Sequence, residues 1–320
     1  MSKPEQKDIV TSNSYRRLTQ RPRLMTWFLE TRPQFLLLTP ACFLVGAAAA
    51  YWDRGRLVPL SLFLAFVGAL LGHVSVNVLN DVEDFLSGID LHTRPTPFSG
   101  GSGFLVRGEL SPEEVRRLGL VALGGTIPIG LYFIWRHGWG IIPLGMIGVA
   151  LVLLYTREIT RNPWICLVAP GLGFGPIMVL GAYFCQTGHY GTTAAAASLV
   201  PGFLVSDLLL LNQFPDVEAD ARGGRWNLPL HWGLQKTSRL YGVLILTPFA
   251  WVTIATAVGV FPLGSLLALL TLPLAYRAAC EVPRNYEDLE RLIPLMGLNV
   301  AVTLITPTLL ALGIFLHRLL

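Results

Sequence analysis

The sequence predicts an all-α, polytopic membrane protein with about nine transmembrane helices. Hydrophobic residues make up 52% of the 320 residues and charged residues only 14%, a balance far from that of soluble globular domains. The apolar residues fall into runs close to the roughly 20 residues that a spanning helix needs. Nine such runs are predicted as spans: 33–51, 58–80, 118–135, 140–155, 165–185, 194–214, 240–260, 263–279 and 292–316.

The distribution of positive charge predicts the topology of these spans. Residues 1–24 are polar and lack the short apolar core of a signal peptide, so we expect a cytoplasmic N-terminal segment followed by a transmembrane domain at 25–320. The loops that this topology places inside hold 20 of the 24 Lys and Arg residues, as cytoplasmic loops should. The net charge of +4 therefore reflects topology, and no nucleic-acid partner is expected. The sequence predicts a multi-pass protein of a bacterial-type inner membrane.

The four cysteines give no sign of a metal or disulfide site. Cys42, Cys166, Cys185 and Cys280 lie in or beside apolar runs, without the spacing of metal ligands. We interpret them as packing residues.

Two polar clusters interrupt the apolar chain. The first contains Asn77, Asn80, Asp81, Asp84 and Asp90, and the second contains Asn212, Asp216 and Asp220. Carboxylates are costly near a hydrocarbon core, so a compensating cation or a function is expected to retain them. The second and sixth spans both run from outside to inside, which places the two clusters on the same cytoplasmic face, each followed by a long loop.

Helical spacing brings the polar side chains of each cluster to one face. Asn77, Asp81 and Asp84 stand at i, i+4 and i+7. The second cluster repeats the pattern at i, i+4 and i+8, although Pro215 would loosen a helix there. The simplest alternative is that these residues only solvate two helix ends, but two such clusters on one face favour a binding site.

The loop after the first cluster contains its own helix signal. Ser111-Pro112-Glu113-Glu114 combines an N-cap serine, a first-turn proline and a capping-box glutamate. This pattern predicts a short cytoplasmic helix that begins here.

The donor atoms of the clusters favour a hard cation. All of them are oxygens, with no nearby Cys and no paired His, which favours Mg²⁺ over zinc or copper. Mg²⁺ commonly takes its remaining ligands from phosphates, so a diphosphate substrate is expected. Arg94, Arg222 and Arg225 in the cytoplasmic loops can contact phosphate oxygens, although each can equally be a topology signal.

On these motifs the chain resembles the UbiA superfamily of intramembrane prenyltransferases, in which two aspartate-rich motifs bind an isoprenyl diphosphate through Mg²⁺. The first motif reads Asn77-x-x-Asn80-Asp81-x-x-Asp84-x-x-x-Gly88-x-Asp90. It is similar to the branch that prenylates 1,4-dihydroxy-2-naphthoate in menaquinone synthesis, as is Glu30-Thr31-Arg32-Pro33 at the first span. The second motif departs from that branch: Asn212-Gln213-Phe214-Pro215-Asp216 replaces Asn-Asn-x-Arg-Asp, and Arg225 and Asn227 replace Lys and Thr.

The resemblance implies a bundle around a central cavity and Mg²⁺-dependent transfer of an isoprenyl group to an aromatic acceptor, with release of diphosphate. It implies that Asp81, Asp84, Asp216 and Asp220 hold Mg²⁺. The surrounding diphosphate shell would consist of Asn77, Asn80, Asp90, Asn212, Arg94, Arg222 and Arg225. Arg32 would hold a carboxylate of the acceptor and Tyr155 would line its pocket. Arg32 can instead mark topology, and Tyr155 can be an interfacial aromatic.

Three alternatives stay open at this level. The acceptor can be 4-hydroxybenzoate or homogentisate. A UbiA-type terpene cyclase would keep the fold and the metals but close the prenyl chain on itself. A secondary transporter would also contain intramembrane carboxylates, but these usually lie near the bilayer midplane, whereas the present clusters lie at helix ends.

Overall fold

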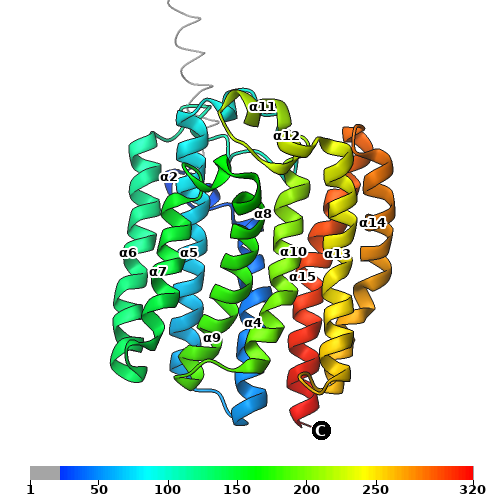
Figure 1. Cartoon of the computed structure of the whole chain (residues 1–320). Coiled ribbons are helices and arrows are strands. Elements are labelled where there is room, and N and C mark those ends of the chain that lie inside the picture. The colour runs from blue at the N-terminus through cyan, green and yellow to red at the C-terminus, as the bar shows by residue number, and fades with distance from the viewer. Residues whose placement is uncertain (1–21, 320) are drawn as a thin grey trace, which may run out of the picture.

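The computed structural model describes residues 22–319, and all regular structure in that range is helical. Most of the predicted N-terminal segment, 1–24, lies outside the described residues. Figure 1 shows long helices packed side by side, with short helices gathered at one end. The α-helices are α2 (Arg23–Glu30), α3 (Pro33–Leu36), α4 (Leu38–Arg54), α5 (Pro59–Leu86), α6 (Pro112–His137), α7 (Ile142–Leu154), α8 (Pro163–Leu172), α9 (Met178–Thr187), α10 (Thr192–Asn212), α11 (Val217–Arg222), α12 (Leu228–Trp232), α13 (Leu234–Ala257), α14 (Leu272–Asn285) and α15 (Leu289–Leu319).

Within the described range, eight helical segments are long and apolar enough to cross a membrane. They are Pro33–Arg54, Pro59–Leu86, Pro112–His137, Pro163–Thr187, Thr192–Asn212, Leu234–Ala257, Leu263–Asn285 and Leu289–Leu319. The remaining predicted span, 140–155, corresponds to a shorter apolar helix, Trp139–Leu154. The prediction of an all-α membrane protein with about nine apolar helices is therefore confirmed.

The capping box at Ser111 is present, but the helix that it starts is longer than predicted. The Ser111 hydroxyl accepts from the Glu114 N–H at 3.3 Å, and the Glu114 carboxylate accepts from the Ser111 N–H at 3.0 Å. The helix then continues without a break to His137 as α6. The prediction of a separate short helix was wrong because residues 113–118 are mostly good helix formers, and the single Gly119 that follows does not end the helix.

One span contains a π-helical turn that fixes its contact with α10. Helices α8 and α9 are joined through Gly173–Ile177, which includes Pro176. A Cβ atom added at Gly171 would lie 2.2 Å from the Gly202 carbonyl oxygen of α10, and one at Gly175 would lie 2.5 Å from the Ser198 carbonyl oxygen. Only glycine permits this approach, which positions α10 and the polar cluster at its end.

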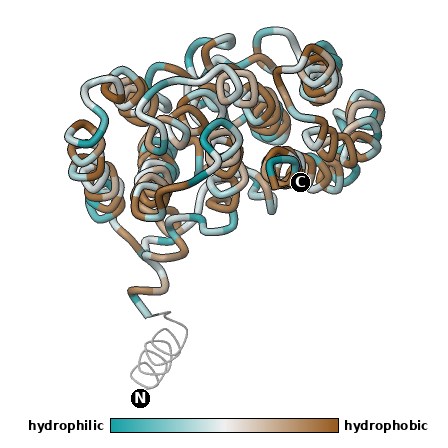
Figure 2. Tube along the Cα trace, turned by 90° about the horizontal axis from the view of Figure 1, so that it is seen from below, coloured by the Kyte–Doolittle hydropathy of each residue, from teal (hydrophilic) through white to brown (hydrophobic). Residues whose placement is uncertain are grey.

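The buried core lies between the helices, while their outer surfaces remain apolar. The largest buried cluster includes Leu204, Tyr241 and Met296 from α10, α13 and α15. On α6, by contrast, Val121 and Leu131 are exposed. The end-on view in Figure 2 shows hydrophobic residues along most of the helices. A surface of this kind suits contact with lipid chains.

The two long loops, 87–111 and 213–233, lie at the same end of the bundle. Figure 1 shows α11 and α12 at this end, above the ends of α5 and α10. The first cluster lies at and just beyond the C-terminal end of α5, and the second begins at the last residue of α10 and continues into the following loop, so both clusters open into the same region.

Candidate active site

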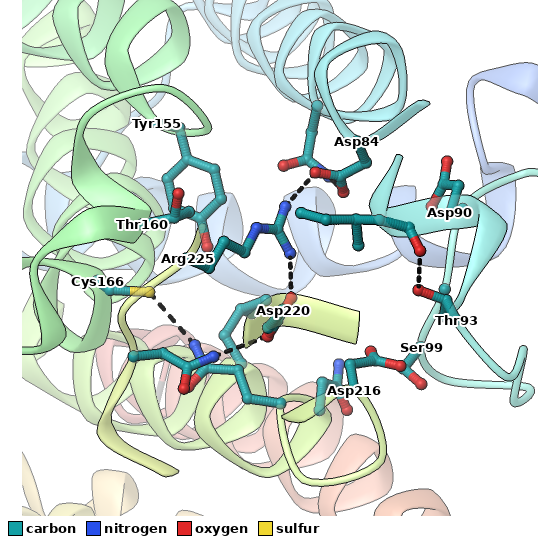
Figure 3. A pocket seen from close by; sticks show the side chains of 18 of the residues that line it. Asp84, Asp90, Thr93, Ser99, Tyr155, Thr160, Cys166, Asp216, Asp220 and Arg225 are labelled. Carbon is teal, nitrogen blue, oxygen red and sulfur yellow. Dashed lines mark hydrogen bonds and ion pairs between the residues drawn. The ribbon is translucent and has the colours of Figure 1, made fainter. Parts of the chain in front are cut away.

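The two polar clusters meet across Arg225. This residue follows α11, and its guanidinium donates to Oδ1 of Asp84 and, at 3.0 Å, to Oδ1 of Asp220. Figure 3 shows the guanidinium between the two carboxylates. Both carboxylates are buried. The planar fork of an arginine can bridge two acidic groups, whereas a lysine ammonium cannot match this geometry.

Glycines shape the path of the loop that carries Arg225. A Cβ atom at Gly223 would lie 2.0 Å from Cγ1 of Ile89, so only glycine lets the end of α11 approach the 3-10 turn Ile89–Leu91 so closely. Gly224 adopts φ +76°, a conformation that favours glycine. The chain then turns back, and Arg225 enters the space between the clusters.

Asn80 orients Asp84 within the first cluster. Its amide nitrogen donates to Oδ2 of Asp84 at 2.8 Å, one helical turn later, and its amide oxygen accepts from the Thr156 hydroxyl at 2.9 Å. Asp84 is therefore bonded through both oxygens. Asn77 does not line the cavity described below, and its amide donates to the Thr31 carbonyl at 3.3 Å.

A loop covers Asp81. The Ser102 N–H donates to Oδ1 of Asp81 at 2.9 Å, and the Ser102 hydroxyl lies 2.6 Å from Oδ2. A Cβ atom at Gly101 would lie 2.9 Å from Oδ1 of Asp81 and 2.6 Å from Oδ2 of Asp90. The carboxylates of Asp81 and Asp90 therefore both lie close to the α-carbon of Gly101, and Asp90 lines the cavity described below, whereas Asp81 does not.

Glu30 is a second acidic partner of the same serine. Its Oε2 lies 2.6 Å from the Ser102 hydroxyl, and its side chain is fully buried at the end of α2. A hydroxyl has one proton and can donate to only one of the two carboxylates. The other short contact requires a proton on that carboxyl group, which then donates to the Ser102 oxygen. Burial and the neighbouring Asp81 raise the pKa of Glu30 to about 8, which indicates that Glu30 holds this proton near neutral pH.

The second cluster does not form a continuous helix. Helix α10 ends at Asn212, and Asp216 precedes the separate helix α11, which contains Asp220. The predicted helical spacing of i, i+4 and i+8 was therefore wrong. Pro215 explains the break, because it lacks an N–H group and its ring clashes with the preceding turn. The Asn227 amide donates to Oδ2 of Asp220 at 2.7 Å, which holds α11 in place.

A cavity of about 130 Å³ lies between the clusters. Its lining combines charged side chains, among them Asp84 and Arg225, with neutral ones, among them Tyr155 and Leu209. It is lined by Arg32, Asn80, Asp84, Ile89, Asp90, Thr93, Phe98, Ser99, Gly100, Gly101, Tyr155, Thr160, Cys166, Leu209, Asn212, Gln213, Asp216, Asp220, Arg225 and Asn227.

Burial shifts the titration of the carboxyl groups around the cavity. Burial and the neighbouring Asp81 raise the pKa of Asp90 to about 7, while burial and Asp220 raise the pKa of Asp216 to about 7. Burial also raises the pKa of Asp220. For Arg225, burial acts to lower the pKa, but Asp84 and Asp220 reverse this effect and raise it. Arg225 is thus a permanent cation beside groups that can change charge near neutrality.

Two residues predicted to bind an acceptor reach the cavity. Arg32 donates to the Gly100 carbonyl and lies 4.5 Å from the centre of the Phe35 ring. Its φ of +57° is left-handed, a conformation that costs about 1–2 kcal/mol for a residue with a Cβ atom. Tyr155 also lines the cavity, and burial raises the pKa of its phenol.

The other two predicted arginines lie elsewhere. Arg94 and Arg222 are exposed and do not line the cavity. Both stand in the two loops that cover the site, so they lie on its outer surface. Arg225 is thus the only one of the three predicted loop arginines that lines the cavity.

The donor atoms of the site fit a hard cation shared with a ligand. Among residues 22–319, no three Asp, Glu, His or Cys side chains converge closely enough to form a complete metal site. However, Oδ2 of Asp90, Oδ1 of Asp216 and Oδ1 of Asn212 are buried without a hydrogen-bond partner in the described part of the chain. Oxygen donors that supply part of a coordination shell suit a cation that completes it with water and phosphate.

Several residues at the site were not identified from the sequence as site residues. Ser102 contacts Asp81, Glu30 contacts Ser102, and Cys166 in the cavity lining accepts a hydrogen bond from the Gln213 amide at 3.3 Å. The two glycines before Ser102 were the available signal for a close backbone approach. The placement of Cys166 and Gln213 depends on packing between α8 and α10, for which the sequence contains no local signal.

Comparison with known families identifies the class of protein. Residues 39–316 match the model of the UbiA prenyltransferase family, which covers most of the chain. The chain belongs to the UbiA prenyltransferase family. This UbiA protein is therefore a transferase of prenyl groups, and the predicted resemblance is confirmed.

Individual relatives of this UbiA protein agree with the assignment. The 1,4-dihydroxy-2-naphthoate octaprenyltransferase of Escherichia coli (strain K12) is 26% identical over 312 residues, which cover 93% of this chain and 98% of that protein. A solved structure of digeranylgeranylglyceryl phosphate synthase has a TM-score of 0.65 at 15% identity and covers 92% of this chain and 99% of that one. A UbiA homologue from Archaeoglobus fulgidus, bound to DMAPP and Mg²⁺, has a TM-score of 0.60 at 12% identity and covers 91% and 99%. The two structures show that the fold is shared.

Proposed function

We propose that this UbiA protein transfers an isoprenyl group from a prenyl diphosphate to an aromatic acceptor in a Mg²⁺-dependent reaction that releases diphosphate. The acceptor is 1,4-dihydroxy-2-naphthoate or a similar quinone precursor. The observation that carries the proposal is the meeting of two acidic clusters across Arg225 at one cavity whose lining also contains neutral residues. The name of the Escherichia coli relative supports the acceptor, and the Archaeoglobus fulgidus structure, bound to DMAPP and Mg²⁺, supports the donor and the metal.

The site faces the cytoplasm in this proposal, and the membrane is a bacterial-type inner membrane. The segments that would lie on the same side as the two loops hold 20 of the 24 Lys and Arg residues, and positive charge is enriched on the cytoplasmic side. Both substrates would then reach the cavity from the cytoplasm or the inner leaflet.

The acidic residues have distinct roles in this proposal. Asp81, Asp84 and Asp90 from one cluster and Asp216 and Asp220 from the other would hold Mg²⁺. Bound there, Mg²⁺ would neutralise the charge of the departing diphosphate. Asn80, which orients Asp84, and Asn212, whose amide oxygen is buried without a partner among the described residues, complete the polar shell.

Arg225 acts as the resident counter-charge of the acidic residues. In its absence, the carboxylates of Asp84 and Asp220 would repel each other across the cavity. When a diphosphate enters, the same guanidinium can donate to phosphate oxygens in two parallel hydrogen bonds. Arg32, on another part of the wall, adds a second positive charge.

The neutral residues of the cavity lining suit the aromatic ring. Tyr155 and Leu209 provide an apolar surface, and the amide oxygen of Gln213 is buried without a partner among the described residues, so it can accept a hydrogen bond from a hydroxyl group of the acceptor.

In the proposed reaction, the allylic carbon–oxygen bond of the donor breaks, and its electron pair leaves with the diphosphate. A ring carbon of the acceptor then bonds to the allylic carbon, and the ring loses a proton or carbon dioxide. The two covering loops exclude water, which would otherwise capture the allylic carbon.

A panel of acceptors tests this function. Purified protein is incubated with Mg²⁺, farnesyl or geranylgeranyl diphosphate, and dihydroxynaphthoate, 4-hydroxybenzoate or homogentisate, and the products are analysed by mass spectrometry. We expect a prenylated naphthoate-derived product and acceptor-dependent release of diphosphate. A cyclic hydrocarbon formed without acceptor would instead identify a terpene cyclase.

The raised pKa values of Asp90 and Asp216 predict how Mg²⁺ binding depends on pH. Asp90 and Asp216 have a pKa of about 7, so each is mostly protonated below pH 7 and must lose its proton to bind a cation. We expect Mg²⁺ affinity to fall as the pH drops through 7, and binding at pH 7 to release protons. Calorimetry in two buffers with different ionisation enthalpies measures this release. Identical heats in both buffers would contradict the prediction.

The contact between Gly101 and two carboxylates predicts a strong effect of a single methyl group. In Gly101→Ala, the new Cβ atom would lie 2.6 Å from Asp90 and 2.9 Å from Asp81 and would force them apart. Gly101 does not have a positive φ, so the substitution acts on the carboxylates rather than on backbone conformation. We expect Mg²⁺-dependent turnover to fall about 10- to 100-fold, as for altered metal surroundings. Gly124→Ala, which meets no atom within 4 Å, is the matched control and should retain activity.

A further inference from the structure

Three segments that are distant in the sequence converge on the Ser102 hydroxyl. Ser102 lies in the loop after the first cluster, Glu30 ends the short helix α2, and Asp81 lies on α5. The hydroxyl lies 2.6 Å from Oε2 of Glu30 and 2.6 Å from Oδ2 of Asp81. Glu30 and Asp81 are both almost fully buried. This small network is therefore part of the protein interior and does not belong to a solvated surface.

The network fixes both oxygens of Asp81. The Ser102 N–H donates to Oδ1 of Asp81 at 2.9 Å, and the Ser102 hydroxyl donates to Oδ2. The plane of the carboxylate therefore cannot rotate without the loss of a hydrogen bond. The Ser102 hydroxyl could rotate away if nothing held its other side. Glu30 holds that side, and a buried hydrogen-bonded partner of this kind limits the hydroxyl to one orientation.

The same network also fixes the position of Gly101. Because Gly101 precedes Ser102, the two hydrogen bonds from Ser102 to Asp81 anchor the Gly101 backbone, whose α-carbon lies close to the carboxylates of both Asp81 and Asp90. The Arg32 guanidinium anchors the other side of this backbone through the Gly100 carbonyl. The spacing between Asp81 and Asp90 is thus set by residues outside the two acidic clusters.

We propose that Glu30 and Ser102 are positioning residues, which hold Asp81 and the Gly101 backbone in the geometry that the divalent cation requires. The inference rests on the proposed function. Neither residue is proposed to bind the cation or either substrate. Their effect is on the ligand that they orient, as for outer partners of metal ligands in general.

The test measures binding of Mg²⁺ alone to the purified full-length chain, from the shift of its melting temperature, beside the Mg²⁺ dependence of turnover. We expect Glu30→Ala and Ser102→Ala to raise the half-saturating Mg²⁺ concentration about 10- to 100-fold in both measurements. At saturating Mg²⁺, the KM for the aromatic acceptor should stay at its wild-type value. Glu30→Gln should restore Mg²⁺ binding to within about threefold, because its amide can still donate to the Ser102 hydroxyl.

Ser111→Ala is the matched control for general destabilisation. It removes a helix cap whose side chain accepts a hydrogen bond from Glu114 and makes none to the acidic residues of the site, so it should lower the melting temperature without a change in the Mg²⁺ midpoint. Wild-type Mg²⁺ midpoints in Glu30→Ala and Ser102→Ala would overturn the inference, as would a Glu30→Gln variant as defective as Glu30→Ala. If the wild-type chain itself neither binds Mg²⁺ nor consumes prenyl diphosphate, the proposed function fails, and the inference that rests on it is overturned as well.

Discussion

Asp84→Asn and Asp220→Asn are each expected to reduce prenyl transfer on the order of 10³-fold. Each substitution keeps the size of the side chain but removes one negative charge from the proposed cation site. A bound cation supplies several kcal/mol of charge stabilisation, and about 1.4 kcal/mol corresponds to a tenfold change in rate. The measurement is the release of diphosphate at saturating acceptor, over a range of Mg²⁺ concentrations.

Glu83→Gln is the matched control for these two substitutions. Glu83 precedes Asp84 on α5, but its carboxylate pairs at the surface with Arg157 at 2.9 Å and Arg116 at 3.7 Å. Exposed pairs of this kind contribute about 0–1 kcal/mol, so activity should change little. If Asp84→Asn or Asp220→Asn transferred prenyl groups at the wild-type rate, the proposal that this aspartate binds the cation would be contradicted.

Arg225→Met is expected to lower both stability and donor affinity. The substitution leaves two buried carboxylates, Asp84 and Asp220, without the cation that bridges them. Loss of one partner from a buried ionic network costs about 3–5 kcal/mol, which thermal unfolding in detergent measures. Loss of a charge-assisted hydrogen bond of about 1.5–3 kcal/mol should raise the KM for prenyl diphosphate about 10- to 100-fold.

Two further variants separate charge from geometry. Arg225→Lys keeps the charge but cannot bridge both carboxylates with a planar fork, so we expect partial recovery of stability and less recovery of the KM. Arg222→Met changes an exposed arginine three residues earlier and should behave like the wild type. If Arg222→Met raised the KM as much as Arg225→Met, the effect would arise from loop charge in general, and the bridging role would be contradicted.

The apolar helices and the convergence of the two clusters could be predicted because they depend on local and global rules that the sequence contains. Length and hydropathy predict the spans, and the alternation of direction in a bundle places the ends of the second and sixth spans together. The oxygen-only donor set of Asp84, Asp216 and their neighbours likewise follows from residue type.

The details of the site depend on backbone geometry that residue type does not reveal. Three loop arginines were equivalent in the sequence, and only the turn at Gly224 brings Arg225 inward while Arg222 stays outside. Pro215 contained the signal for the break after α10, but the regular spacing of the second cluster suggested a continuous helix. The signal from Pro215 was the stronger one because proline both removes a hydrogen bond and introduces a clash.

Long-range contacts were the least predictable feature of the site. Glu30 and Asp81 are brought together by Ser102 across separations that no periodicity describes. The acidic side chain of Glu30, at the end of a short helix, gives no sign in the sequence that it is buried. Its burial follows from the path of the loop that contains Ser102.

A double-mutant cycle tests most directly whether the two clusters form one site. The kcat/KM for prenyl diphosphate is measured for Asp84→Asn, Asp220→Asn and the double variant, at fixed Mg²⁺ and acceptor concentrations. Residues that act on one shared group show strongly non-additive effects. We therefore expect the double variant to be about as impaired as the worse single variant. Losses that multiply in the double variant would show two independent sites and would contradict the account.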